Sequence, residues 1–350
     1  MIELKSDSLV FSFPEVHTSA KLEIDLQRTL RIPDDGGLYP LPPGVGEFPL
    51  LHVDDFAERV PKAWIEHGGV MFPMYQSEAM WIYFHATYDE ERAVSYPFAV
   101  KIATGKINAV TGKAWEFGLS RREQDYVVAP EQPWLDGYCV KKGEIRQFVA
   151  MPLGAGYSAE EQVTGKAEHG GLQIMAFPMK REVYEKRFPK VAKRGRDVAC
   201  YCMDDRPDMF SQVMESSMGL APGGRMKQEI YDDPYEYTDW DLGHCSRCFV
   251  HITNSMVWHS ITGKNPPTTP PTSEEYTRAG LPWFDWYDDH NRALQGSGRL
   301  SGMKSVADLG KEKGDVPLPE NESVDPDNIV KLRRNLKPGQ VREWKQPMLM

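Results

Sequence analysis

Cysteine is scarce in this sequence, which contains five in 350 residues. An odd number at such low density differs from the paired cysteines that stabilise small secreted domains. The first residues, Met1–Ser8, also lack the apolar segment of a secretory signal peptide. Together, the two absences predict a cytoplasmic protein in a reducing environment.

Long apolar runs and an excess of positive charge are absent as well. Apolar runs such as Met80–Phe84 are far shorter than the roughly 20 residues of a membrane-spanning helix. The formal net charge is −10, from 41 basic and 51 acidic residues. The densest basic run, 180–196, is interrupted by Glu182 and Glu185. We therefore expect neither a membrane nor a nucleic acid among the partners.

Familiar catalytic and cofactor-binding motifs are missing too. The chain has no Gly-x-Ser-x-Gly and no His-Glu-x-x-His. The Thr-Gly-Lys triplets at 104–106 and 111–113 lack the spacing of a phosphate-binding loop and favour hairpin turns. Gly154 and Gly156 begin a dinucleotide fingerprint, but Ala159 replaces its third glycine and acidic residues follow. The sequence therefore predicts no cofactor.

What the sequence does contain is alternating polarity. Residues 21–27 place Leu22, Ile24 and Leu26 on one face and polar side chains on the other, which predicts a half-buried strand. A hairpin is expected over 97–110, with further strands at 79–85, 145–151, 172–177, 228–231, 248–252 and 340–344. The predicted class is α+β, mainly β, with a largely antiparallel sheet or sandwich, short peripheral helices and long shaped loops.

Helices are expected at 54–65, 180–193, 208–218, 254–262 and 326–334, the last capped by Asp325. From about residue 296 the chain becomes polar. We therefore predict a single large β-rich domain over 1–295 and a C-terminal extension over 296–350. A polar extension is ordered only where something holds it, so we expect it to pack on this body or on a neighbouring copy.

The connection between strands 145–151 and 172–177 is rich in glycine, with Gly154, Gly156, Gly165, Gly170 and Gly171. Glycine is favoured where the backbone has positive φ or a ligand approaches closely. The loop is therefore expected to have a fixed form and to contribute a site. A Ser158–His169 pair is conceivable there, although the sequence shows no third orienting group.

Two other groups of residues suggest chemistry. Cys200, Cys202, Cys245 and Cys248 offer sulfur ligands for tetrahedral zinc, and the alternative is buried or incidental thiols. Carboxylates and aromatic rings alternate in 231–241 and 283–290, as in carbohydrate sites, and the alternative is core or interface anchors. The candidate ligand-binding residues are Tyr157, Ser158, Glu160, Gln162, His169, Asp239, Trp240, Asp285 and Trp286.

Four stretches resemble a family of uncharacterised proteins from bacterial and fungal genomes. They are 28–36, 146–157, 224–231 and 281–285, and the likeness extends over most of the chain. No activity, cofactor or catalytic residue comes with this resemblance.

Two functional hypotheses follow. The first is a self-associating structural or interaction protein without catalysis, present as a homo-oligomer or larger assembly. The alternative is an enzyme or binding protein for a neutral polar ligand such as a carbohydrate. Its site would use the 154–171 loop and the clusters of aromatic rings and carboxylates.

Overall fold

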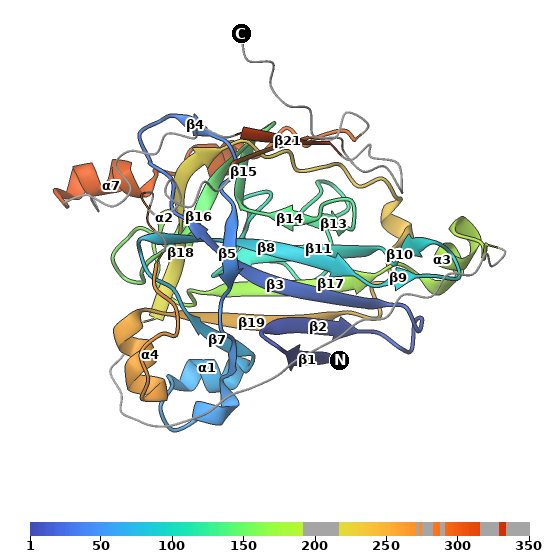
Figure 1. Cartoon of the computed structure of the whole chain (residues 1–350), viewed down its shortest axis with the longest axis horizontal. Helices are drawn as coiled ribbons and strands as arrows, with labels where there is room; N and C mark the ends of the chain where they lie inside the picture. The colour runs from blue at the N-terminus through green and yellow to red at the C-terminus, as the bar shows by residue number, and fades with distance from the viewer. Residues whose placement is uncertain are drawn as a thin grey trace, which may run out of the picture.

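The protein folds into a large, mainly antiparallel β-sheet with a few short helices, which confirms the α+β, mainly β class. The computed structural model shown in Figure 1 describes residues 1–191, 217–270, 272, 274, 283–287, 291–315 and 329–333. Within these ranges, no helix has the length and hydropathy needed to cross a bilayer.

The large sheet contains seventeen strands. They are β1 (Ile2–Lys5), β2 (Ser8–Ser12), β3 (Lys21–Leu30), β4 (Leu38–Tyr39), β5 (Gly44–Glu47), β6 (Leu51–His52), β7 (Val70–Pro73), β8 (Glu78–Ala86), β11 (Phe98–Thr104), β12 (Ile107–Asn108), β13 (Val127–Ala129), β14 (Trp134–Leu135), β15 (Gly137–Lys141), β16 (Glu144–Pro152), β17 (Leu172–Pro178), β18 (Ser217–Met226) and β19 (Ser246–Thr253). Two small pairs are separate: β9 (Tyr88–Asp89) with β10 (Val94–Ser95), and β20 (Trp283–Tyr287) with β21 (Ile329–Arg333).

The helices are short. They are η1 (Asp54–Phe56), α1 (Lys62–His67), α2 (Ala159–Thr164), α3 (Arg181–Arg187), η2 (Tyr237–Asp239), α4 (Ser255–Thr262), α6 (Gly298–Ser301) and α7 (Val306–Lys313).

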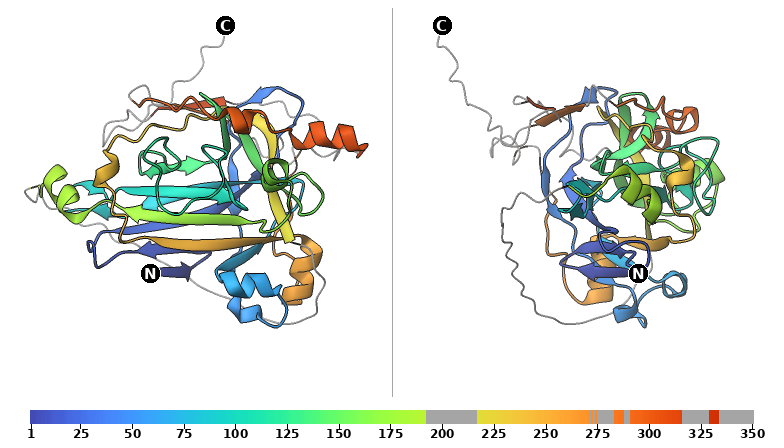
Figure 2. Two further views of the ribbon diagram at one scale, coloured as in Figure 1. Left: turned by 180° about the vertical axis from the view of Figure 1, so that it is seen from behind. Right: turned by 90° about the vertical axis from the view of Figure 1, so that its right-hand side faces the viewer.

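The sheet folds back on itself to form two layers. The order β2–β3–β8–β16–β18–β19–β17–β11 is joined by antiparallel pairing throughout. In Figure 1, β16 and β18 run across the direction of β3, β8, β17 and β19 and connect the layers. The right-hand view of Figure 2 separates β3 and β5 on one side from β17 on the other. The hydrophobic core lies between the layers.

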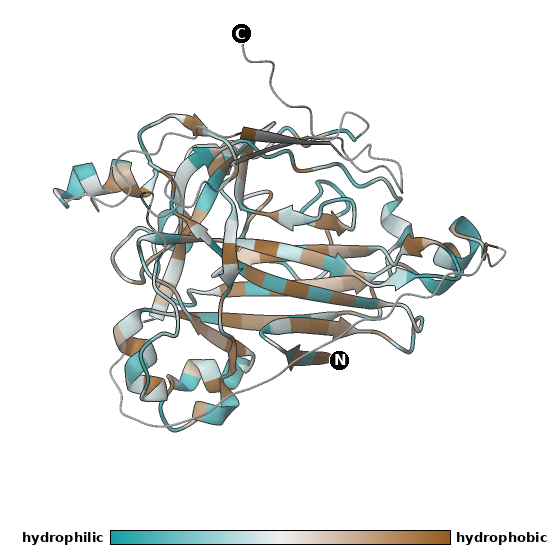
Figure 3. Cartoon of the chain, in the orientation of Figure 1, coloured by the Kyte–Doolittle hydropathy of each residue, from teal (hydrophilic) through white to brown (hydrophobic). Residues whose placement is uncertain are grey.

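The predicted alternation of β3 is confirmed, with one face of the strand in the core and the other face turned away from it. Leu22, Ile24 and Leu26 are buried in the core, and Glu23 and Gln27 point away from it, as the striped colouring of β3 in Figure 3 illustrates. The neighbouring β8 alternates in the same way, with Met80, Ile82 and Phe84 inward. Burying each such side chain contributes about 1.5–3 kcal/mol.

The central strands are also confirmed, since β16 and β17 include the predicted ranges 145–151 and 172–177. The connection between them is more regular than expected, because it contains the helix α2. The predicted strand 248–252 lies within β19, and the hairpin turn after Thr104 joins β11 to β12.

The predicted helix at 254–262 is confirmed as α4. The Asn254 side chain accepts a hydrogen bond from Val257 N at 2.8 Å and caps its first turn. Gly263 follows with φ of 75°, the left-handed conformation that ends many helices.

Other predicted elements were wrong in extent or type. The single helix predicted at 54–65 is divided into η1 and the start of α1. Pro61 interrupts it, because proline disfavours helical backbone in the residue before it and has no N–H group to donate, and α1 begins directly after it. The helix expected at 180–193 ends at Arg187, shortly before Pro189. The range 228–231 forms no strand, and Tyr231 makes an isolated β-bridge to Ala293.

The helix expected at 326–334 is a strand over Ile329–Arg333, which runs parallel to β20. Its Ile-Val-Lys-Leu-Arg sequence has β-branched residues that favour extended backbone. The helix expected at 208–218 lies outside the described residues except for the last two, which begin β18. The strand at 340–344 lies wholly outside them.

Candidate functional site

The glycine-rich loop is shaped chiefly by its own side chains. The Ser158 hydroxyl accepts a hydrogen bond from Glu161 N at 3.2 Å and thus caps α2. Glu161 in turn accepts from the backbone N–H groups of Gly154, Gly156 and Ser158. Ser158 is therefore engaged in a capping box, which stabilises the start of a helix.

Glu160 and His169 meet across this loop. The buried Glu160 carboxylate accepts hydrogen bonds from the backbone N–H groups of His169 and Gly170. His169 Nε2 is buried without a hydrogen-bond partner among the described residues. Burial lowers the pKa of His169, and the centroid of the His67 ring lies 6.1 Å from that of His169. No hydrogen bond is found between Ser158 and His169.

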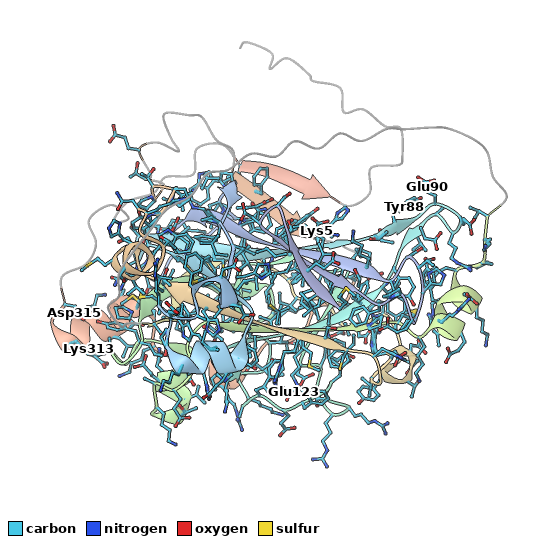
Figure 4. The ribbon with its side chains drawn as sticks, turned by 90° about the horizontal axis from the view of Figure 1, so that it is seen from below. Lys5, Tyr88, Glu90, Glu123, Lys313 and Asp315 are labelled. Atoms are coloured by element: carbon cyan, nitrogen blue, oxygen red, sulfur yellow. The ribbon has the colours of Figure 1, made fainter. Side chains whose placement is uncertain are left out.

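Tyr157 and Gln162 contact the segment 297–315, which we call the C-terminal arm. Gln162 Nε2 donates to Lys304 O at 3.0 Å and its Oε1 accepts from Lys304 N at 2.9 Å. The Tyr157 hydroxyl contacts the Asp315 carboxylate, beside Lys313 at the end of α7 (Figure 4). These two side chains hold the arm against the loop.

Of the two predicted residues near η2, Trp240 lies in the core and Asp239 is only half-buried. Trp240 is 1% exposed, and its Nε1 donates to Asp233 Oδ2 at 2.8 Å. Asp239 pairs with Arg187 at 2.9 Å. This arrangement matches the alternative interpretation of a buried anchor. Asp285 and Trp286 lie in β20, but their side chains are outside the described part of the structure.

The zinc hypothesis remains a prediction, because Cys200 and Cys202 lie outside the described residues. Cys248 is buried in β19, and its thiol donates to Phe249 O at 3.4 Å. Burial raises the pKa of Cys248 to about 12 and also raises that of Cys245. The described residues contain no group of three or more potential metal ligands.

The structure also shows an aromatic cluster that the sequence analysis missed, on the outward face of β8. The ring centroids of Trp81 and Tyr83 are 5.9 Å apart, those of Tyr83 and His85 are 6.5 Å apart, and Trp134 of β14 lies 6.3 Å from Trp81. We call these four residues the ring ladder. Trp81 meets both Tyr83 and Trp134 edge to face. In each pair, the ring that presents its edge does not cover its own faces with the other ring, so those faces are not used in that contact.

Carboxylates line the ring ladder from the neighbouring strands. In the register of β3 with β8, Glu23 lies opposite His85, Asp25 opposite Tyr83 and Gln27 opposite Trp81. Glu47 of β5 then pairs with Gln27, whose side-chain amide donates to its carboxylate at 3.3 Å. We call the ring ladder together with Glu23, Asp25, Gln27 and Glu47 the aromatic–acidic face.

Polar atoms on this face lack partners. Asp25 Oδ1 and Trp81 Nε1 are buried and form no hydrogen bond with the described residues. Burial raises the pKa of Asp25, against the effect of a hydrogen bond from Ser8. The Glu47 residue is exposed, but partial desolvation of its carboxyl group raises its pKa, and the nearby charge of Asp25 adds to that shift. Unsatisfied buried polar atoms are uncommon in folded proteins and call for an explanation.

The sequence contained a signal for this face. The alternation of 79–85 puts Trp81, Tyr83 and His85 on one side, just as 21–27 puts its acidic residues on one side. What the sequence did not give is the pairing of these two strands, which places the two rows side by side.

Known proteins supply no further information about the site. No family model, no curated protein and no solved structure matches this chain.

Proposed function

We propose that the protein binds a carbohydrate-like ligand on the aromatic–acidic face. The proposal corresponds to the second sequence-based hypothesis but moves the site to β3, β5, β8 and β14. The observation that carries it is a row of partly exposed rings beside carboxylates on the adjacent strands. The apolar face of a pyranose stacks on aromatic rings, and its hydroxyl groups donate to carboxylates.

The unpartnered atoms support the same ligand class. A polyhydroxylated ring has donors for Asp25 Oδ1 and acceptors for Trp81 Nε1. A purely apolar ligand would leave both atoms unsatisfied at a cost in affinity.

The test is isothermal titration calorimetry with a panel of oligosaccharides, using the protein and a Trp81→Ala/Trp134→Ala variant. We expect the variant to lose binding, since stacking on the ring ladder is removed. Phe117→Ala is the matched control, because Phe117 is 72% exposed and lies outside the aromatic–acidic face. Absence of binding by the unmodified protein, or equal binding by both aromatic variants, would refute the proposal.

Self-association is the second proposal, and a different surface favours it. Met256 of α4 and Ile65 of α1 are 76% and 37% exposed, on helices that pack against one cluster and lie side by side in Figure 1. Sedimentation velocity tests it: a Met256→Glu/Ile65→Glu variant should dissociate a dimer that the unmodified protein forms. A monomeric unmodified protein at micromolar concentration would count against this proposal.

A further inference from the structure

The aromatic–acidic face has more negative charge than its own residues balance. Glu23, Asp25 and Glu47 form no ion pair with any lysine or arginine in the described part of the chain. Asp25 raises the pKa of Glu47, and Glu23 raises the pKa of both, as expected for neighbouring like charges, while His85 of the ring ladder lowers the pKa of Asp25.

The excess of negative charge is least favourable at Asp25, because its carboxylate is buried. It is only 9% exposed, and its Oδ1 has no hydrogen-bond partner among the described residues. A carboxylate withdrawn from water is stable when a cation or several donors compensate it. Asp125, another buried carboxylate, is compensated in this way, since it pairs with Lys101 at 2.7 Å.

The rings beside these carboxylates attract cations as well. The face of an aromatic ring is electrostatically negative and binds ammonium groups, most strongly in Trp and Tyr. Trp81 and Trp134 adjoin Tyr83, and Tyr83 lies directly across from Asp25. A cationic group between Tyr83 and Asp25 would contact both an aromatic ring and a carboxylate. A neutral hydroxyl group at the same place would leave the negative charge of the carboxylate uncompensated.

We propose that the ligand is an oligomer of a cationic amino sugar, in which successive pyranose rings stack on Trp81 and on Trp134 and an ammonium group lies between Asp25, Glu47 and Tyr83. This inference rests on the proposed function and narrows it to one ligand class. It follows from charge complementarity: the ring ladder selects a flat apolar face, and the carboxylates select a positive charge attached to it.

Three tetrasaccharides with the same β-1,4 backbone test the inference by calorimetry at one pH and ionic strength. They are the tetramers of glucosamine, N-acetylglucosamine and glucose. We expect the glucosamine tetramer to bind tighter than the other two by on the order of tenfold or more, the size of one hydrogen bond to a charged group. Raising the salt concentration should reduce this preference, since the charges are partly exposed.

Charge-neutralising variants locate the effect. Asp25→Asn should remove most of the preference for glucosamine while binding of the glucose tetramer persists. Glu47→Gln should reduce the preference too, and Glu47 is exposed, so its change leaves folding intact. Glu123→Gln is the control, because Glu123 is exposed, pairs with Lys113 and belongs to none of the strands β3, β5, β8 and β14 that form the aromatic–acidic face.

The outcomes separate the two proposals. Equal affinity for all three tetramers overturns the amino-sugar inference and leaves the proposed function standing. Absence of binding by every tetramer overturns both. A preference for glucosamine that survives both Asp25→Asn and Glu47→Gln also overturns the inference. A linear polyamine that binds as tightly as the glucosamine tetramer would show that the sugar ring is not recognised, with the same consequence.

Discussion

Arg28 and Glu78 form an ion pair on the inward side of β3 and β8. Arg28 Nε and Nη2 donate to Glu78 Oε2 at 3.1 and 2.9 Å, and both side chains are buried. Removing one partner of such a pair leaves an uncompensated charge and costs about 3–5 kcal/mol. We expect Arg28→Met to lower the free energy of unfolding by that amount, measured by urea denaturation.

The double variant Arg28→Met/Glu78→Leu is the control for this experiment. It removes both charges, so much of the lost stability should return. Burial raises the pKa of Glu78, while Arg28 lowers it. A loss below about 1 kcal/mol in Arg28→Met would mean that Glu78 is neutral in the folded protein and that the pair is not ionic.

His251 predicts a pH dependence of stability. Its ring stacks on Trp64 at 4.4 Å, and burial lowers its pKa from 6.5 to about 4. Between these values the unfolded chain binds a proton that the folded protein excludes. The contribution of His251 to the free energy of unfolding is therefore complete above pH 6.5. It is lost as the pH falls towards 4, and the total loss is about 3 kcal/mol.

His251→Gln removes this titration, and the measurement is the free energy of unfolding of both proteins between pH 4 and 7. We expect the unmodified protein to lose more free energy of unfolding than His251→Gln as the pH falls from 7 to 4. Asp136, whose pKa burial raises to about 7, titrates with the opposite sign in both proteins and cancels in the difference. A difference that is independent of pH would contradict the burial of a neutral His251.

At the scale of elements, the C-terminal arm depends on few contacts. Gln162 makes two hydrogen bonds with the backbone of Lys304. Each such bond contributes about 1 kcal/mol, so Gln162→Leu should weaken the arm by about 2 kcal/mol. Hydrogen exchange of the amides in 298–313 should then be faster by roughly tenfold or more.

Glu312→Ala is the matched control in the same arm, because Glu312 pairs with the side chain of the same Lys304 at 2.6 Å. Both partners of that pair are exposed, so its removal should change the exchange little. If Gln162→Leu leaves the exchange unchanged as well, the apolar contacts of Val306 hold the arm, and the two hydrogen bonds do not.

The sequence was informative for elements whose signal is local. The alternation of 21–27 predicted β3, and Gly263 marked the end of α4. It failed for 326–334, where pairing with β20 prevails over the helix-start signal of Asp325 and Pro326. The ring ladder was missed for a related reason. The acidic row of β3 and the aromatic row of β8 are 54 to 62 residues apart in the sequence, and only the register of β3 with β8 places them together.

At the scale of the whole molecule, the aromatic–acidic face lies on the outside of one layer of the folded sheet. Exposed aromatic rings on a sheet favour association between copies. Interface centres are depleted of charged residues, and three unpaired carboxylates on each copy would repel one another. We infer that Glu23, Asp25 and Glu47 keep this face from pairing with itself.

Neutralising these three residues tests the argument. The variant Glu23→Gln/Asp25→Asn/Glu47→Gln should associate with increasing concentration in sedimentation velocity experiments. The control Glu58→Gln/Glu90→Gln/Glu123→Gln changes exposed residues elsewhere. Both variants raise the formal net charge by three, from −10 to −7, so overall charge cannot explain a difference between them. Equal association of the two variants would mean that the carboxylates of the aromatic–acidic face do not prevent contact between copies, and that ligand binding is their remaining role.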